Sequence, residues 1–421
     1  MKQDALTIIA PVRPERLEAL RGLLREIGQG ADASPLVPFR DVPSLHFARW
    51  ALVPPATPGG RTQLAFESNF DGPAESHLAE LVDALGAHLA RVYAHCAGFE
   101  AGGPKPAASL EGYLRRQTLR EIAFYVGAPG LTRALVENDR RVRLALDRQA
   151  DELVRRGIVP RDPEVARRNL LAALEGEPGL ELGPAGDPAP APKRAWLVAA
   201  LVAGGVALLP ALPAALPPAL ALALALRWHE RRDAARPAAW PPDDDEHLDE
   251  VTRREDAHAQ NPMTHLVPVK AGLLRAFAVR AALTAIDLLG RHVYTEGRLG
   301  QISSIHFARW VLLRDQRLLF FSNYDGSWES YLGDFVDKQS EGLSAVWSNT
   351  EGFPPTRWLV GEGASHEEQF KLWVRRHQLP TQVWFSAYPS LSLPEVLRNA
   401  RLREGSVADG PRDPRAWLSE L

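Results

Sequence analysis

An internal repeat is the sequence feature that most constrains this fold. The heptapeptide Ser-Leu-His-Phe-Ala-Arg-Trp at residues 44–50 returns as Ser-Ile-His-Phe-Ala-Arg-Trp at residues 304–310. The pentapeptide Ser-Asn-Phe-Asp-Gly at 68–72 returns as Ser-Asn-Tyr-Asp-Gly at 322–326, and weaker matches continue in the same order. Collinear self-similarity over this length indicates two copies of one structural unit. The sequence therefore predicts a tandem duplication.

Each copy has the same predicted order of strands and helices. In the first copy, hydrophobic periodicity predicts helices over 15–27 and 78–92, and strands over 6–12, 45–53, 64–68 and 122–126. The second copy repeats this order from a strand at 263–269, through a long apolar helix at 273–293, to a final strand at 383–387. The order βαββαβ is that of the ferredoxin-like unit. We therefore expect an α+β fold built from two tandem ferredoxin-like repeats.

The predicted strands carry apolar residues on both faces. Phe320 and Phe321, for example, are consecutive. Strands of this kind occur in sheets that are covered on both sides. One face would pack on the helices of its own copy, and the other on the sheet of the second copy. We expect the two copies to form a pseudo-dimeric α+β barrel within one chain; the alternative is two independent domains that each dimerise between chains as a homo-oligomer.

Residues 195–226 form an apolar run without a charged side chain. Prolines near its centre, among them Pro217 and Pro218, predict two short helices rather than one long one. Basic residues flank both ends, and such residues favour the cytoplasmic side of a membrane. The run predicts a membrane-inserting hairpin over 195–228, with the lipid bilayer as partner and both repeats membrane-associated on the cytoplasmic side. The alternative is a linker rich in alanine, leucine and proline.

Composition shifts predict the domain boundaries. We expect a first repeat over 1–176, a Pro/Gly linker over 177–194, the hairpin over 195–228, an acidic Pro-rich linker over 229–262 and a second repeat over 263–421. The 49 basic and 52 acidic side chains are nearly balanced, which argues against a nucleic-acid partner. A single cysteine, Cys96, excludes a disulfide framework and a cysteine-rich metal site.

The repeated motifs contain the candidate site residues. His306 and its counterpart in the first copy lie in strands, with Arg309 three residues further on and on the opposite face. A buried histidine can ligate a metal or haem, or move protons, but it can equally have a structural role. Asp71 and Asp325 stand where a strand ends and a helix begins, so each is either a helix cap or an acid/base group.

The duplicated plan resembles the dimeric α+β barrel superfamily, which includes dye-decolorizing peroxidases and chlorite dismutase-like haem proteins. The peroxidases carry a Gly-x-x-Asp-Gly motif, and residues 322–326 resemble it with serine at the first position. This resemblance implies that Asp325 is the distal acid, that Arg309 is the distal arginine and that His306 is the axial haem ligand.

Three functions are compatible with these patterns. The first is a haem-dependent, peroxidase-like oxidoreductase held at the membrane. The second is a non-catalytic barrel that binds a lipid or an apolar small molecule, and the third is a scaffold module at the membrane surface. The second copy is richer in aromatic residues than the first, which predicts that any pocket lies mainly in the second half.

Overall fold

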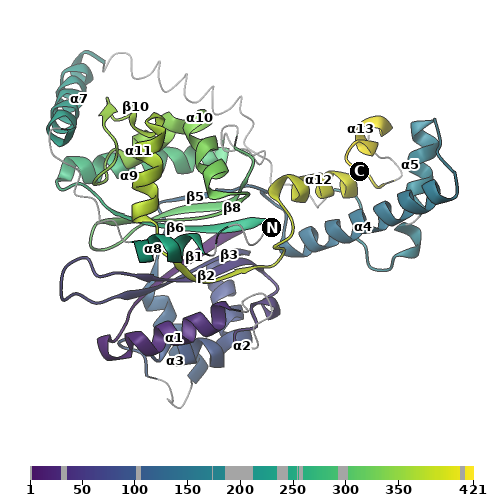
Figure 1. Ribbon diagram of the computed structural model, residues 1–421, viewed down its shortest axis with the longest axis horizontal. Coiled ribbons are helices and arrows are strands. Elements are labelled where there is room, and N and C mark those ends of the chain that lie inside the picture. Colours follow the sequence, from purple (N-terminus) through teal and green to yellow (C-terminus); the bar gives the residue numbers. More distant parts are fainter. Residues whose placement is uncertain are drawn as a thin grey trace.

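The protein is described by a computed structural model. The structure describes residues 2–29, 36–100, 106–172, 174–184, 212–234, 245–253, 255, 259–292, 302–407 and 413–421. Their strands form two large antiparallel sheets and one two-stranded ribbon, with helices on the outside (Figure 1). The predicted α+β class is confirmed. Both large sheets are open at their edges, so the described strands do not close into a barrel.

The first half begins with a strand and a helix, as the periodicity predicted. Its elements are β1 (Gln3–Pro11), η1 (Pro14–Arg16), α1 (Leu17–Gly28), η2 (Phe39–Asp41), β2 (Leu45–Val53), β3 (Gln63–Asp71), α2 (Ala74–Tyr93), α3 (Pro106–Gln117), β4 (Thr118–Leu119) and β5 (Ala123–Val126). Helices α4 (Arg133–Arg155) and α5 (Pro163–Leu171) and the short η3 (Leu174–Gly176) follow. Strand β2 has the bounds that the sequence predicted.

The second half repeats the early part of this order. Its elements are β6 (Gln260–Pro268), α9 (Leu273–His292), β7 (Ile305–Leu312), β8 (Arg317–Asp325), α10 (Trp328–Trp347), β9 (Thr356–Arg357), β10 (Gly361–Glu362), η5 (Gly363–Ser365), α11 (Glu367–His377), β11 (Thr381–Ser386), α12 (Leu393–Glu404) and α13 (Pro414–Leu418). Helices α7 (Leu212–Ala234) and α8 (Asp245–Thr252) precede it.

The two halves exchange their last strands. The first sheet has the order β11-β2-β3-β1-β4, and the second has the order β5-β7-β8-β6. Strand β11 of the second half thus pairs with β2, and β5 of the first half pairs with β7. The strand pattern alone predicted each of these segments as the last strand of its own unit. The structure places each one at the edge of the other half's sheet.

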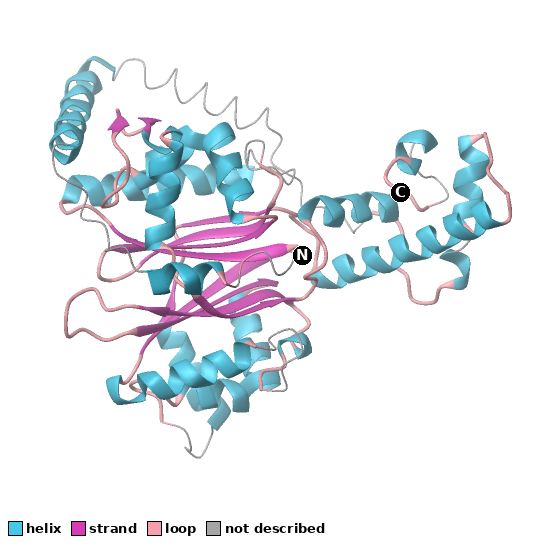
Figure 2. Cartoon of the chain, viewed as in Figure 1, coloured by secondary structure: helices cyan, strands magenta, loops and turns pink. Residues whose placement is uncertain are grey.

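The two sheets are stacked face to face in the centre of the molecule (Figure 2). An apolar cluster between them draws Ile9, Val53 and Ala65 from the first sheet and Val311 and Phe321 from the second. Helices α1, α2 and α3 cover the outer face of the first sheet, and α9, α10 and α11 cover that of the second (Figure 1). Each strand is therefore buried on both sides, which explains its continuous apolar sequence.

Four helices form an arm that projects from one end of the stacked sheets (Figure 1). Helix α4 follows β5 and packs along α12, which follows β11. Buried apolar residues of all four helices, among them Val142, Leu170, Leu402 and Trp417, form the core of the arm. The helices that follow the two exchanged strands, α4 and α12, are thus brought together in the arm.

The membrane-inserting hairpin predicted over 195–228 contains no membrane-spanning helix in the part of the chain that the structure describes, so a transmembrane reading of it is wrong. None of the described helices combines the length and the apolar content needed to span a membrane. Residues 195–211 lie outside the described residues. Residues from Leu212 form α7, which continues through Pro217 and Pro218 instead of breaking there. Its apolar part ends at Leu226 and is about 22 Å long, short of the roughly 30 Å of hydrocarbon in a bilayer.

Helix α7 is attached to the second half by its polar end. The buried Glu230 carboxylate accepts hydrogen bonds from the backbone N–H of Leu359 at 2.8 Å and from the Thr356 hydroxyl at 2.6 Å. The Asp233 carboxylate accepts a hydrogen bond from Arg275 at 2.5 Å. Part of the linker predicted over 229–262 is therefore structured. By contrast, the leucine-rich start of α7 is exposed, with Leu220 61% accessible.

Candidate functional site

Charged side chains form a cluster between the two sheets. Arg49, Glu67 and Arg309 are each 1% exposed or less. The Glu67 carboxylate accepts hydrogen bonds from Arg49 Nε at 2.6 Å and from Arg309 Nη2 at 2.7 Å. Burial lowers the pKa of Arg49, and the nearby positive charge of Arg309 adds to this effect, whereas Glu67 opposes it. A single carboxylate therefore balances two buried guanidinium groups.

Each arginine of this cluster reaches into the opposite half. Arg49, from β2, donates to the backbone carbonyl of Met263 at 2.8 Å. Arg309, from β7, donates to the backbone carbonyl of Ser68 at 2.6 Å. These contacts engage the guanidinium that the resemblance would assign to peroxide chemistry. Their observed effect is to link the two sheets.

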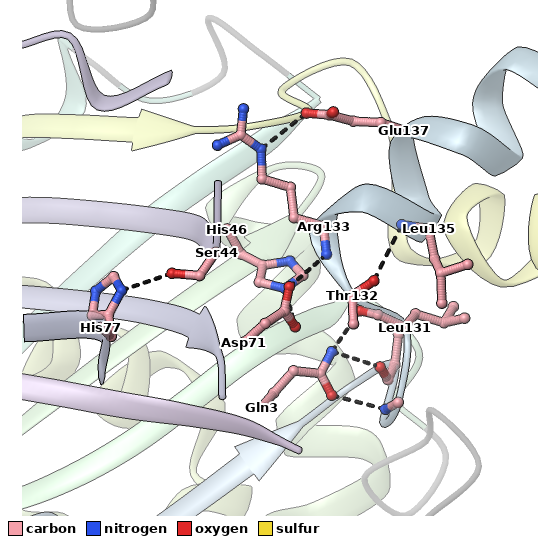
Figure 3. A network of polar contacts seen from close by, with 12 residues as sticks. Gln3, Ser44, His46, Asp71, His77, Leu131, Thr132, Arg133, Leu135 and Glu137 are labelled. Atoms are coloured by element: carbon pink, nitrogen blue, oxygen red, sulfur yellow. Dashed lines mark hydrogen bonds and ion pairs between the residues drawn. The ribbon is translucent and has the colours of Figure 1, made fainter. Parts of the chain in front are cut away.

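The repeated histidines and aspartates pair with one another at the base of the arm. In the first copy, His46 Nε2 lies 3.0 Å from Asp71 Oδ1. The second carboxylate oxygen of Asp71 accepts a hydrogen bond from the backbone N–H of Arg133 at 2.8 Å, at the start of α4 (Figure 3). In the second copy, His306 Nε2 lies 2.7 Å from Asp325 Oδ1.

Each aspartate contacts the start of a helix, as predicted, but it is not the helix that directly follows it in the sequence. Asp325 Oδ2 accepts a hydrogen bond from the backbone N–H of Leu393 at 2.6 Å, at the start of α12. The helix that directly follows Asp325, α10, is instead capped by Ser327. Each aspartate thus stabilises the helix after the exchanged strand, where a carboxylate is favourable to the positive end of the helix dipole. The sequence alone could not reveal this contact, because Asp325 and Leu393 are far apart in the chain.

A β-bulge gives the histidines an orientation that differs from the prediction, which placed histidine and arginine on opposite faces of the strand. The pairing of β2 with β3 shifts register between Leu45 and Phe47, and the pairing of β7 with β8 shifts at the matching position. His46 therefore contacts Phe307 of the other half, with ring centroids 5.4 Å apart. Arg49 also reaches the other half, so the histidine and the arginine do not lie on opposite sides of the sheet. Bulges re-aim side chains in this way.

The surroundings of His306 do not fit a haem group. Its Nε2 atom is engaged by Asp325, and the side chain is 2% exposed. The ring lies 5.4 Å from the ring of Phe47 and 6.1 Å from that of Tyr388. An axial ligand needs a free nitrogen with room for a porphyrin in front of it, and these side chains fill that space. The resemblance therefore does not extend to a haem site at His306.

The thiol of Cys96 is buried. Burial raises the pKa of the Cys96 thiol to about 12, so the thiol stays protonated at neutral pH. Within the ranges that the structure describes, no group of three or more His, Cys, Asp or Glu side chains could hold a metal ion.

A narrow crevice lies on the other side of the second sheet, beneath α10 and α11. Its free volume is about 20 Å³, which is room for about one water molecule, and it is partly open to the surface. Its floor is a row across the sheet in which Phe320 pairs with His265 on one side and with Trp310 on the other. The first half has the same row of Ile8, Phe66 and Trp50. The only difference within this row is histidine in place of isoleucine.

The roof of the crevice also differs between the halves where α10 is kinked. Phe335 and Leu343 of α10 line the crevice. Between them, Gln339 has non-helical backbone angles (φ −144°, ψ 23°) and kinks the helix. The matching residue of α2 is Leu85, which is fully buried in the core of the first half. The crevice therefore lies where a core leucine has been replaced and the helix is interrupted.

His265 is the most polar side chain that lines this crevice. The side chain is 1% exposed, and neither ring nitrogen has a hydrogen-bond partner in the part of the chain that the structure describes. Burial holds the pKa of His265 well below its usual range, and the neighbouring His377 adds to the shift. The imidazole is therefore neutral, with one N–H to donate and one lone pair to accept. Unsatisfied buried polar groups are rare and call for an explanation.

Neither the searched family models, nor the curated proteins, nor the solved structures include a match to this chain.

The reasoning from sequence alone missed His265 and Gln339. It singled out residues that are the same in both copies, and these prove to bind the halves together. The informative signal was the opposite one, namely the positions where aligned copies differ in polarity: Ile8 against His265, and Leu85 against Gln339. The crevice does lie in the second half, where the aromatic content predicted a pocket.

Proposed function

We propose that this chain is a ligand-binding protein whose second half opens its crevice to hold a small, largely apolar molecule. This proposal takes up the second of the three functions that the sequence allowed. The supporting observation is His265, a buried imidazole at the floor of a largely apolar crevice, whose two ring nitrogens have no partner among the described residues. Binding pockets are typically apolar with a few placed polar groups, and this crevice has that character.

The proposal includes an origin for the scaffold. We infer that the chain is a tandem duplication of a ferredoxin-like unit whose copies pack as a pseudo-dimer. The reciprocal strand exchange and the reciprocal reach of Arg49 and Arg309 support this inference, because both are what a two-fold arrangement of equal units produces. Duplication leaves one copy free to keep a filled core while the other acquires a binding site.

The repeated residues favour binding over catalysis. Their polar atoms are engaged within the protein: Asp71 and Asp325 bind helix starts, and Arg309 binds backbone carbonyls. Catalytic groups must be within reach of a substrate proton or a reacting atom. The repeated His-Asp pairs are therefore best explained as joints between the exchanged strands and the arm.

Toluene binding to the full-length protein tests the proposed function. Ligand-observed NMR and thermal denaturation should detect toluene on the wild type. The Gln339→Leu variant, which introduces the residue of the first half at the kink of α10, should pack the roof as in the first half and weaken binding. Lys338→Leu adds a leucine to the same helix at an exposed position and should leave binding intact. Toluene binding that is absent from the wild type, or equal in Gln339→Leu, would refute the proposal.

A further inference from the structure

We infer that the exposed apolar part of α7 attaches the protein to one face of an anionic lipid bilayer, which the helix enters without crossing. The inference is independent of the crevice and of its ligand. It follows from three properties of α7: apolar side chains on all its sides, aromatic and basic side chains where the apolar part ends, and the attachment of its polar end to the second half.

The apolar part of α7 is exposed on more than one side. Leu216, Leu220 and Leu224 form one stripe, because residues four apart share a face of a helix, and their side chains are between 54% and 61% exposed. Leu222, 40% exposed, lies about 160° around the helix from Leu220. A single stripe suits a protein groove, whereas a helix that is apolar all round is typical of a large protein's core or of a membrane. Helix α7 stands at the edge of the molecule next to β10 (Figure 1), outside its core, so lipid is the surrounding that fits.

The end of the apolar part carries the residues of a membrane–water interface. Trp228 of α7 is 57% exposed, and Trp358, in the turn after β9, is 52% exposed. The Arg232 guanidinium lies 5.4 Å from the ring centre of Trp228. The Arg227 guanidinium lies 5.6 Å from that of Trp358. Tryptophan is enriched where the hydrocarbon of a membrane meets its headgroups, and arginine extends its charge from there into the headgroup layer. The order of leucines, tryptophan and arginines along α7 is therefore that of a helix whose N-terminal part enters lipid.

The polar end of α7 has an excess of positive charge. Its acidic side chains are engaged within the protein, since Glu230 binds the β9–β10 turn and Asp233 binds α9 and Lys270. Arg231 and Arg232 are exposed. Five basic side chains thus share this end with two acidic ones: Arg227, Arg231, Arg232, Lys270 and Arg275 against Glu230 and Asp233. The ribbon adds one exposed charge of each sign and leaves the excess unchanged. Basic side chains beside a membrane surface are attracted to anionic headgroups.

The length of the apolar part allows it to enter a single leaflet. It is about 22 Å long, and one leaflet contributes about 15 Å of hydrocarbon, so the helix fits into one leaflet at a slant. The carboxylates at its polar end fix α7 to the second half, which keeps the sheets outside the lipid. Leu273 and Phe277 of α9, 91% and 62% exposed, lie within one helical turn of Arg275, which binds α7. They add exposed apolar surface beside the attached end.

Vesicle flotation of the full-length protein tests this surface. Vesicles of phosphatidylcholine alone are compared at pH 7.5 with vesicles of three parts phosphatidylcholine to one part phosphatidylglycerol. We expect the wild type to float with both, and more strongly with the anionic vesicles. The double variant Leu220→Ala/Leu224→Ala shortens two exposed side chains of α7, and its partition constant should fall at least roughly 10-fold. The matched control is Leu144→Ala/Val154→Ala on α4, which shortens two exposed side chains of the arm and should float like the wild type.

A second double variant isolates the contribution of charge. Arg231→Gln/Arg232→Gln should weaken binding to the anionic vesicles roughly 5- to 30-fold and leave binding to phosphatidylcholine unchanged. Because all the substituted side chains are exposed, urea unfolding should match the wild type in each variant and so exclude a folding defect.

Two outcomes would overturn the inference on lipid binding itself. The first is a wild type that stays at the bottom of the gradient with both kinds of vesicle. The second is flotation of Leu220→Ala/Leu224→Ala equal to that of the wild type. A concentration-dependent dimer in sedimentation, abolished by the same leucine substitutions and accompanied by no flotation, would assign the surface to a second copy of the chain instead.

Discussion

Replacing His265 with isoleucine should stabilise the protein. A buried polar group left without a hydrogen bond costs about 1–3 kcal/mol, and His265 is such a group with both ring nitrogens unpartnered among the described residues. Isoleucine occupies the matching place between the same kinds of neighbours in the first half. We therefore expect His265→Ile to raise the free energy of unfolding by about 1–3 kcal/mol at pH 7.5.

Urea unfolding monitored by tryptophan fluorescence measures this change, since Trp310, Trp347 and Trp373 surround the site. The matched control is His77→Ile in α2. His77 is equally buried, but its ring nitrogens lie 2.9 Å from the Ser44 hydroxyl and 3.0 Å from the Ser68 hydroxyl. The same substitution should therefore destabilise at His77 by about 1–3 kcal/mol. A decrease in stability for both variants would refute the reasoning.

The difference in stability between the wild type and His265→Ile should depend on pH, because His265 titrates. In the unfolded chain His265 takes up a proton near pH 6.5. In the folded protein burial lowers its pKa, so the ring stays neutral at that pH. The wild type should therefore lose stability as the pH falls below 6.5, by up to about 1.4 kcal/mol per pH unit from this group. The advantage of His265→Ile over the wild type should grow over the same range. A constant difference between pH 7.5 and pH 5 would contradict the assignment.

Three further perturbations test the joints of the fold. Glu67→Gln leaves two buried arginines without their carboxylate and should cost about 3–5 kcal/mol in urea unfolding, whereas the exposed Glu75→Gln should cost less than about 0.5 kcal/mol. Asp325→Ala removes the acceptor at the start of α12 and should weaken it by about 0.5–2 kcal/mol, seen as faster amide hydrogen exchange in α12 only. Glu230→Ala removes the carboxylate that attaches α7 and should accelerate tryptic cleavage at Arg231; an unchanged rate would show that other contacts hold the helix.

The secondary structure of the sheets could be predicted from sequence because each strand has its own local pattern. The bounds of β2 were predicted to the residue. Which sheet a strand joins is a different question, decided by contacts between distant segments. The pattern of residues 383–387 indicates a buried strand but contains no information on whether its neighbour is β7 or β2. The exchange of last strands therefore could not be predicted.

The site could be predicted only in part. Repetition led to His306, Arg309 and Asp325, and the structure engages all three in contacts that hold the halves together. The mistaken expectation of a membrane-spanning helix has a related cause, because hydropathy counts apolar side chains and takes no account of how a helix is attached. In α7 the attachment depends on Glu230 and Asp233, which lie beyond the apolar run.

The exchange of last strands has a consequence for how the chain must be made. Strand β11 follows β2 by about 330 residues in the chain, yet it completes the sheet to which β2 belongs. During translation the hydrogen-bonding edge of β2 therefore stays open until the second half has been synthesised. An open edge is a template for pairing with other chains. A nascent chain thus depends on β11 for protection of this edge, and truncations that remove β11 should aggregate.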